Sequence, residues 1–312
     1  MSDAVRNTRE LCLSLLPEVS RTFALTIPEL PEPLRVSVGC SYLLCRISDN
    51  IEDHPGLDDR LREKLFDLFL GSLEGESCDE FIQSWPPGPG RDLAENLPGI
   101  LVALQSLPES HRGPINTCVR DMIAGMRKMI LHREPSRKFH VCHSLEELEE
   151  YCHYVAGTVG IMLHGIFTDF TGTACDEKNR EAARRLGLGL QLTNILQDRR
   201  VDASRGISFL PPDSPDPVFL RALTRLQEGH EYTLSLPPEL RLFCLWALWM
   251  AVATLEEVAQ STETRPKIDR GRVTEILTFT RTHLQETGIL ARRFNADLAR
   301  TRDRLSGSEL VK

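Results

Sequence analysis

The chain has 312 residues, of which 41% are hydrophobic, 37 are basic and 45 are acidic, giving a formal net charge of −8. The apolar content supports a substantial core and excludes a disordered chain. The acidic balance excludes a general nucleic-acid-binding role, because phosphate backbones require a basic face.

The cysteines and the hydropathy of the chain indicate the cellular compartment in which we expect the protein. The nine cysteines include no Cys-x-x-Cys pair, so we expect reduced, mostly buried thiols in a cytoplasmic protein. The start MSDAVRNTRE lacks a signal-peptide core. The longest uncharged apolar run, residues 242–255, is too short to span a bilayer and predicts a buried core helix. Any membrane association is therefore expected to be peripheral.

Apolar spacing predicts helices in the N-terminal half. Pro17 is expected to interrupt a short first helix, and the proline-rich stretch 27–34 to form a connection. A long helix is predicted over 34–54, and Asp58 can cap the helix that follows. After a loop at 83–92, helices are predicted over 92–106 and 110–131.

The C-terminal half has the same helical pattern, with no run of alternating strand residues. Ser144 begins a capping box for a helix over 145–170. Four further helices are predicted, with a loop at 203–217 after the first of them: 176–202, 216–230, 238–261 and 270–304. No change in composition marks a boundary, so we expect one all-α domain over residues 1–312.

An acidic motif ends the predicted helix 34–54. Tyr42, Arg46, Asp49 and Asp53 recur at helical spacing and form one stripe, which Glu52 flanks. The rest of this helix is apolar, so carboxylates on an inward stripe would need a counter-charge. Hard oxygen ligands suit Mg²⁺, which also binds substrate phosphates. The alternative is a solvated acidic face.

A second acidic stripe lies on the predicted helix 176–202. It comprises Gln191, Asn194, Asp198 and Asp202. Arg199, Arg200 and Arg205 lie close by in sequence, where they could meet phosphate oxygens. Gly187 and Gly189 would allow close approach of a neighbouring helix or of a substrate. The alternative is a polar seam between helices.

These two stripes suggest prenyl diphosphate chemistry if the fold brings them together. Two carboxylate clusters facing each other across a cavity would hold Mg²⁺, and Mg²⁺ would hold and ionise a diphosphate ester. On the helix between them, small residues at 156, 157 and 160 leave room for an apolar ligand or for tight helix packing. Tyr151 could transfer a proton, stabilise a carbocation or merely cap the helix.

Four motifs together resemble the squalene and phytoene synthase family, whose members join two prenyl diphosphates head to head. They are Ser20-Arg21-Thr22-Phe23, the Tyr42 to Asp53 pattern, YCHYVAGTVG from Tyr151, and QLTNILQDRRVD from Gln191. The resemblance covers roughly residues 10–290. It implies an isoprenoid-synthase-type helical bundle that encloses a central apolar cavity.

Within the family, the chain is most similar to bacterial-type squalene synthases. The first motif ends in Glu52-Asp53, the central helix matches closely, a late hydrophobic helix follows Phe243, and Pro266 to Gly271 resembles the basic segment associated with the nicotinamide cofactor. Two features depart from the pattern. The family usually has an arginine two or three residues before the aromatic-x-Pro of the loop after the second motif, and here Arg205 lies just upstream of that loop, residues 207–211. Ala247 and Leu248 stand where eukaryotic squalene synthases have a proline and a glutamine.

The resemblance also implies roles for seventeen residues. The predicted Mg²⁺ ligands are Asp49, Glu52, Asp53, Asp198 and Asp202. The predicted diphosphate-binding residues are Ser20, Arg21, Phe23, Gln191, Asn194 and Arg205. Tyr42, Arg46 and Tyr151 are predicted to be catalytic. Arg265, Lys267 and Arg270 are predicted to bind NADPH, although a solvated basic loop is an equal alternative.

The implied reaction is condensation of two farnesyl diphosphates to presqualene diphosphate, followed by NADPH-dependent reduction to squalene. One alternative is a phytoene or dehydrosqualene synthase without NADPH. Another is an enzyme of hopanoid synthesis that forms presqualene diphosphate or hydroxysqualene. A non-catalytic binding protein is disfavoured, because the chain keeps all five carboxylates. Insolubility of the product suggests release at a membrane surface. The oligomeric state is left open.

Overall fold

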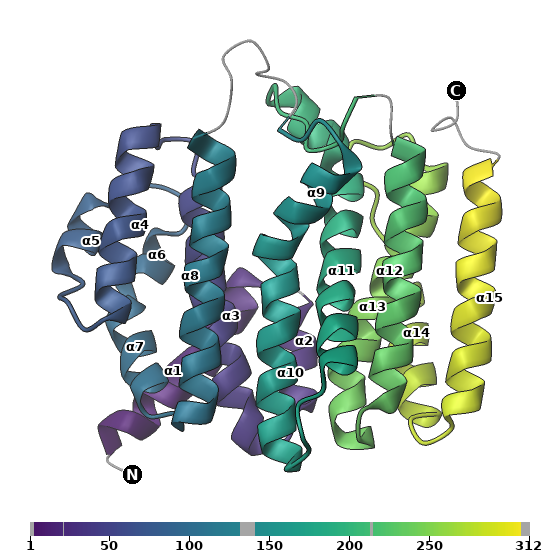
Figure 1. The fold of residues 1–312 in the computed structure, drawn as a ribbon, viewed down its shortest axis with the longest axis horizontal. Coiled ribbons are helices and arrows are strands. Elements are labelled where there is room, and N and C mark those ends of the chain that lie inside the picture. Colours follow the sequence, from purple (N-terminus) through teal and green to yellow (C-terminus); the bar gives the residue numbers. More distant parts are fainter. Residues whose placement is uncertain (1–2, 21, 132–140, 213–214, 307–312) are drawn as a thin grey trace. The chain divides into compact units, whose positions relative to one another are not determined.

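The computed structural model describes residues 3–20, 22–131, 141–212 and 215–306, and over these ranges it contains helices and connecting turns but no β-strand (Figure 1). This confirms the all-α prediction. The chain groups into two compact units, residues 1–131 with 165–174, and residues 132–164 with 175–312. Each unit is described by itself, and the expectation of one domain stays a prediction.

The first unit is built around α3, which packs against α1, α7, α8 and α4. Most positions of α3 are buried, among them Leu43, Leu44 and Ile47. The helices of this unit are α1 (Asp3–Val19), α2 (Phe23–Thr26), the 3₁₀ turn η1 (Ile27–Glu29), α3 (Glu32–Asp53), α4 (Asp59–Leu73), α5 (Asp79–Ser84), α6 (Arg91–Glu95), α7 (Leu97–Gln105) and α8 (Glu109–Leu131).

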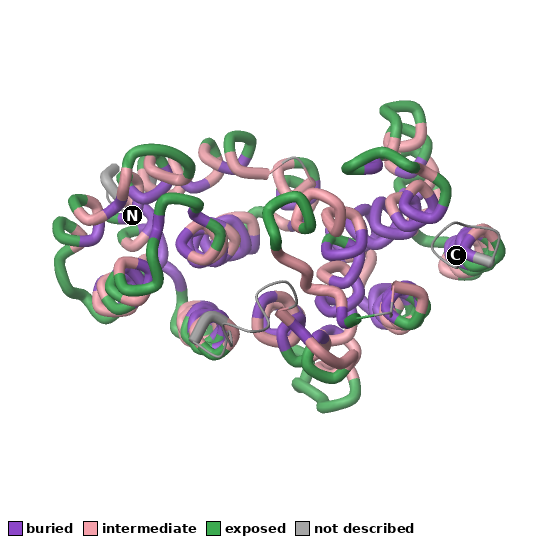
Figure 2. The backbone as a smooth tube through the Cα atoms, turned by 90° about the horizontal axis from the view of Figure 1, so that it is seen from above, coloured by how far each residue is buried: buried purple, intermediate pink, exposed green. Residues whose placement is uncertain are grey.

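The second unit contains the remaining helices. They are α9 (Leu145–Cys152), a π-helical turn η3 (His153–Gly157), α10 (Thr158–Thr171), α11 (Glu177–Ser204), α12 (Pro215–Ser235), α13 (Pro238–Gln260), α14 (Arg270–Thr282) and α15 (Thr287–Ser306). The last turns of α10 belong to the first unit. Figure 2 shows that buried positions concentrate within the helices and exposed positions on the loops.

The core helix of the second unit is α13, which contacts α11, α12, α14 and α15. It is long and apolar enough to cross a membrane, but 89% of its most apolar window is buried inside the protein, as predicted for the run 242–255. Beside it, the ring of His230 stacks on Phe294 at 3.9 Å, and Trp249 lies 6.3 Å from His230. This aromatic cluster joins α12, α13 and α15.

Two predicted helix starts are confirmed by their caps. The Asp58 side chain accepts a hydrogen bond from the N–H of Leu61 at 2.7 Å, and Ser144 accepts one from the N–H of Glu147 at 3.1 Å. Such caps satisfy N–H groups that have no partner within the helix.

Three predicted helix bounds are wrong. Pro17 lies inside α1, where the helix ends two residues later and little hydrogen bonding is lost. The predicted helix 92–106 is two helices, because α6 ends at Glu95 and Pro98 lies in the first turn of a new helix, α7. The predicted helix 270–304 divides into α14 and α15. At this break Arg241 of α13 donates to the carbonyl of Leu284 at 3.1 Å, a tertiary contact that local pattern does not reveal.

Candidate functional site

The first acidic motif occupies the less buried face of α3. From residue 42 onward, the partly or fully exposed positions are Tyr42, Arg46, Asp49, Asn50, Glu52 and Asp53, and every other position is buried. The predicted stripe therefore lies on the less buried face of α3. Asn50 also lies on this face and was not predicted.

Residues of the predicted Ser20–Phe23 motif lie next to this stripe. The phenol of Tyr42 donates to the carbonyl of Val19 at 3.2 Å, and the ring of Phe23 lies 5.1 Å from that of Tyr42. Ser20 accepts a hydrogen bond from the N–H of Phe23 at 2.9 Å. The structure thus groups Ser20, Phe23 and Tyr42, whereas Arg21 lies outside the described residues.

The carboxyl of Asp49 has too little counter-charge. Arg46, at 4.0 Å, is its ion-pair partner, and 38% of the Asp49 side chain is exposed. The pKa of Asp49 is raised to about 7, because desolvation and the charge of Asp53 raise it by more than Arg46 lowers it. Burial also raises the pKa of Tyr42, so its phenol stays protonated at neutral pH and acts as a donor.

Arg62 of α4 holds the end of α3 and was missed by the sequence analysis. Its guanidinium donates to the carbonyls of Ile51, Glu52 and Leu57 at 3.1–3.2 Å and to Asp59 at 2.7 Å. Carbonyls in the last turn of a helix have no partner within the helix. Arg62 supplies these bonds and so fixes the turn that carries Glu52 and Asp53.

The second stripe occupies α11 in the other unit. Gln191, Asn194, Asp198 and Asp202 are partly or fully exposed, between the buried Leu192, Thr193, Ile195 and Leu196. Burial thus separates Gln191 and Asn194 from their buried neighbours, whereas residues 197–202 are all intermediate, so the assignment of Asp198 and Asp202 to one face stays a prediction.

Asp198 is paired with an arginine from the segment between α13 and α14. Arg265 Nε lies 2.6 Å from one Asp198 carboxylate oxygen, and Arg265 Nη2 donates to the other at 2.9 Å. Desolvation raises the pKa of Asp198, while Arg265 and Arg205 lower it. Arg265, predicted from sequence to bind the nicotinamide cofactor, contacts Asp198 in the structure.

The other basic residues near this stripe have different surroundings. Arg200 donates to the carbonyl of Glu263 at 2.8 Å, and Arg199 donates to the carbonyl of Leu196 at 2.7 Å. Both guanidinium groups therefore bind backbone in this structure. Arg205 follows the end of α11 as its exposed C-cap residue, and Lys267 and Arg270 are exposed.

Tyr151 is buried at the end of α9. Its ring is 4% exposed and stacks on Phe209 at a centroid distance of 5.0 Å. Phe209 belongs to the loop after the second acidic motif. Tyr151 therefore lies in the same unit as Asp198, with an aromatic neighbour from the segment that follows it.

The glycines near Tyr151 serve helix packing. A Cβ on Gly160 would lie 2.1 Å from the carbonyl oxygen of Ala183, and a Cβ on Gly187 would lie 2.2 Å from that of Ala156. The backbones of α11 and of the 153–160 segment thus meet directly. Of the two alternatives, room for a ligand and tight packing, the structure supports tight packing at these positions.

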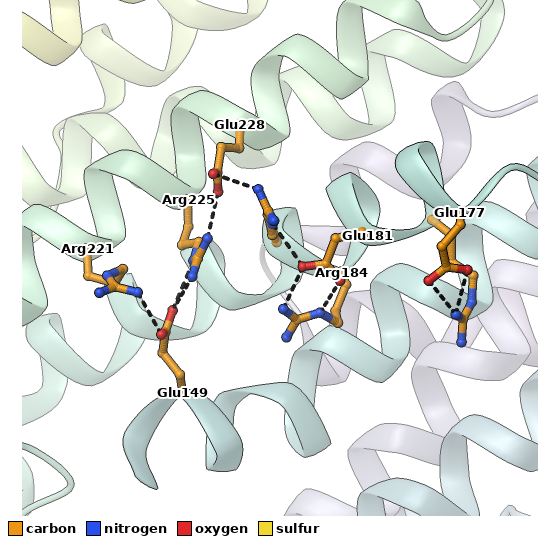
Figure 3. A network of polar contacts seen from close by, with 9 residues as sticks. Glu149, Glu177, Glu181, Arg184, Arg221, Arg225 and Glu228 are labelled. Atoms are coloured by element: carbon orange, nitrogen blue, oxygen red, sulfur yellow. Dashed lines mark hydrogen bonds and ion pairs between the residues drawn. The ribbon is translucent and has the colours of Figure 1, made fainter. Parts of the chain in front are cut away.

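An ion-pair network, also missed from sequence, holds α9 against α11 and α12 (Figure 3). Glu149 accepts from Arg221 at 2.8 Å and from Arg225 at 2.9 Å. Glu228 continues the network to Arg185 at 2.8 Å. Glu149 precedes Tyr151 by two residues, so the network fixes the helix that carries the phenol.

A serine–histidine–aspartate arrangement in the first unit is structural. His111 lies 2.7 Å from the Ser37 hydroxyl and 3.2 Å from Asp169. Ser37 is 0% exposed, so no substrate carbonyl could reach it. These residues join α3, α8 and α10.

The family model described as squalene/phytoene synthase matches residues 16–214, more than half of the chain. The chain belongs to the squalene/phytoene synthase family. The fission yeast Schizosaccharomyces pombe has a squalene synthase that is 29% identical over 85% of this chain, and the match covers 64% of that protein. The chain thus spans slightly less than two-thirds of this relative.

Solved structures share the fold of this family member. TcSQS in complex with a ligand superposes with a TM-score of 0.74 at 22% identity, covering 97% of this chain and 100% of that one. A dehydrosqualene synthase gives a TM-score of 0.63 at 22% identity, covering 90% and 98%. At these identities the likeness concerns the fold alone.

Mg²⁺ fits the donor set of both stripes. The five carboxylates are hard oxygen ligands of the kind Mg²⁺ prefers. Asp49 has insufficient counter-charge, and Asp198 already pairs with a cation, the Arg265 guanidinium. Within the described ranges, no group of three His, Cys, Asp or Glu residues is placed to hold a metal. The prediction that both motifs together bind Mg²⁺ stays a prediction.

Proposed function

We propose that this protein condenses two farnesyl diphosphates head to head to presqualene diphosphate and reduces it to squalene with NADPH. The observation that carries the proposal is the form of the two stripes. Each stripe places carboxylates on partly or fully exposed positions of a helix that packs into its unit, in a chain of the squalene/phytoene synthase family.

The residues would divide the first step between them. Asp49, Glu52, Asp53, Asp198 and Asp202 would hold Mg²⁺. When bound, Mg²⁺ stabilises the negative charge that develops on the departing diphosphate. Ser20, Arg46 and Arg205 would contact diphosphate oxygens. Tyr42 has one phenol proton, and it would donate that proton to the diphosphate only on leaving the carbonyl of Val19.

Tyr151 would act on the hydrocarbon part of the reaction. Departure of diphosphate leaves an allylic cation, which the double bond of the second farnesyl chain attacks. Loss of a proton then closes the cyclopropane ring of presqualene diphosphate. The face of the Tyr151 ring can stabilise the cation, and its hydroxyl can assist the proton transfer. Its burial against Phe209 keeps water from trapping the cation as an alcohol.

The reductive step separates this proposal from its alternatives. Of the three basic residues predicted for NADPH, Arg265 contacts Asp198, which leaves the exposed Lys267 and Arg270 for the cofactor. The alternatives, a dehydrosqualene synthase without NADPH and a hydroxysqualene-forming enzyme, differ from the proposal in this second step.

The test is incubation of the purified protein with farnesyl diphosphate and Mg²⁺, with and without NADPH, followed by mass spectrometry of the products. Squalene formed only with NADPH would support the proposal. A conjugated triterpene, an alcohol or presqualene diphosphate in the presence of NADPH would contradict the second step. If nothing forms, geranylgeranyl diphosphate is the next substrate to test.

Two variants separate an enzyme from a non-catalytic relative. Asp49→Asn and Asp198→Asn should each abolish most turnover while the protein keeps its helical circular dichroism. Asp303→Asn, on an exposed position of α15, removes the same charge and should leave turnover unchanged. Equal activity in all three variants would contradict the assignment of the stripes.

A further inference from the structure

The segment 261–269, between α13 and α14, lies along the C-terminal part of α11. Gln197 donates to the carbonyl of Pro266 at 2.6 Å, and Arg200 donates to the carbonyl of Glu263 at 2.8 Å. Pro266 itself is buried. These contacts fasten the segment on either side of Arg265, so the ion pair of Arg265 is not needed to hold it.

Arg265 engages both oxygens of the Asp198 carboxylate. Nη2 donates a hydrogen bond to Oδ2 at 2.9 Å, and Nε lies 2.6 Å from Oδ1 as an ion-pair contact without hydrogen-bond geometry. Both oxygens of Asp198 are thus close to one positive charge, which weakens their attraction for a second cation. The Arg265 side chain is nonetheless 54% exposed, and ion pairs of that exposure are weak enough to be exchanged.

We propose that Arg265 is an internal counter-cation, which occupies Asp198 until a divalent metal ion displaces it. This inference rests on the proposed function, in which Asp198 is a metal ligand. Binding of the metal would then be an exchange: the metal gains the Asp198 carboxylate, and the guanidinium of Arg265 is released. Because Gln197 and Arg200 keep the segment in place, the released group stays near the metal-bound diphosphate, whose oxygens it can contact.

The test measures metal binding without turnover. Mn²⁺ serves as the probe, and its free concentration is followed by electron paramagnetic resonance during titration of the intact protein. Arg265→Gln should bind Mn²⁺ about 5-fold more tightly than the unmodified protein, the factor that corresponds to loss of an exposed ion pair worth ~1 kcal/mol. Arg265→Lys keeps the charge but not the guanidinium, and should fall between the two.

Two controls assign the gain to Asp198. Arg302→Gln, on an exposed position of α15, removes the same charge and should leave Mn²⁺ affinity unchanged. In an Asp198→Asn background, Arg265→Gln should give no gain, since the competition no longer exists. Melting temperatures of all variants confirm that the compared proteins are folded.

The outcomes separate this inference from the proposed function. Unchanged Mn²⁺ affinity in Arg265→Gln, or a gain that persists with Asp198→Asn, would overturn the role of Arg265 while leaving the metal site intact. Absence of Mn²⁺ binding in every variant, even with inorganic pyrophosphate added, would overturn the metal site and this inference with it. A gain confined to the Asp198 background would establish the exchange.

Discussion

The guanidinium of Arg62 donates hydrogen bonds to four oxygens beside the first acidic motif. Its partners are backbone carbonyls at the end of α3 and the carboxylate of Asp59. A charged donor that is 9% exposed and fully engaged contributes strongly, because its removal leaves buried acceptors without partners.

Arg62→Met should therefore lower the free energy of unfolding by about 2–3 kcal/mol, since methionine keeps the apolar stem but none of the donors. Denaturant unfolding followed by circular dichroism measures the change. The matched control is Arg60→Met on an exposed position of α4, expected to stay within about 0.5 kcal/mol. Equal losses in the two variants would show that Arg62 does not cap α3.

For single residues, the sequence predicted which helix face a side chain occupies, but it did not predict the hydrogen-bond and ion-pair partners of the arginines. Spacing alone placed Asp49 on the less buried face of α3, because a helix repeats at a fixed period. The partners of Arg62 and Arg265 could not be predicted. Arg62 binds carbonyls, which no side-chain pattern encodes, and Arg265 meets a carboxylate that lies 67 positions away.

Among the elements, the contact between α10 and α11 depends on glycine. The carbonyl of Ala183 lies where a Cβ of Gly160 would be, whereas a Cβ on Gly165 would lie 3.9 Å from Pro114, an ordinary contact. Both glycines belong to α10. Replacing each glycine by alanine changes helix propensity by the same amount, whereas only the change at Gly160 creates a clash.

Gly160→Ala should destabilise the protein by about 1–3 kcal/mol or more, because the two backbones must separate. Gly165→Ala should be neutral or stabilising by up to about 1 kcal/mol, through higher helix propensity. Thermal and denaturant unfolding of the pair measures both effects. A loss of the same size at both positions would mean that Gly160 is not a close-approach position.

Helix existence was predictable, whereas breaks inside long helical patterns were not. Caps at Asp58 and Ser144 are local chemistry and could be recognised from sequence. The break between α14 and α15 has neither proline nor glycine in residues 283–286, and it is held by Arg241 of another helix. A tertiary contact decided that boundary.

For the whole molecule, the buried His230 couples folding to pH. Desolvation among Phe294 and Trp249 lowers the pKa of His230 to about 4. In the unfolded chain a histidine titrates near pH 6.5. Between these values the unfolded state binds the additional proton, so the contribution of His230 to stability is complete above pH 6.5 and is lost as pH falls toward 4.

His230→Phe should therefore make stability less sensitive to acid, because phenylalanine preserves the ring stack and does not titrate. The difference in unfolding free energy between the variant and the unmodified protein should move in favour of the variant by roughly 2 kcal/mol between pH 7.5 and pH 4.5. Denaturant melts across that range provide the measurement. Parallel pH profiles for the two proteins would contradict this origin of acid sensitivity.

The all-α class and the family were accessible from sequence because both depend on local periodicity and short motifs. The meeting of the two acidic stripes in one site depends instead on the packing of separate units, which periodicity does not encode. It therefore stays a prediction, and the two Asp→Asn variants described above are its experimental test.

The π-helical turn at His153–Gly157 lies between Tyr151 and α10, so the number of residues in this turn sets the direction in which Tyr151 points. A single π-helical turn holds one more residue than an α-helical turn. Since successive α-helical residues are rotated by about 100°, deletion of one residue here would rotate Tyr151 away from Phe209 while leaving the glycine contacts of α10 in place. The direction of the phenol therefore depends on the number of residues in this turn as well as on their identity.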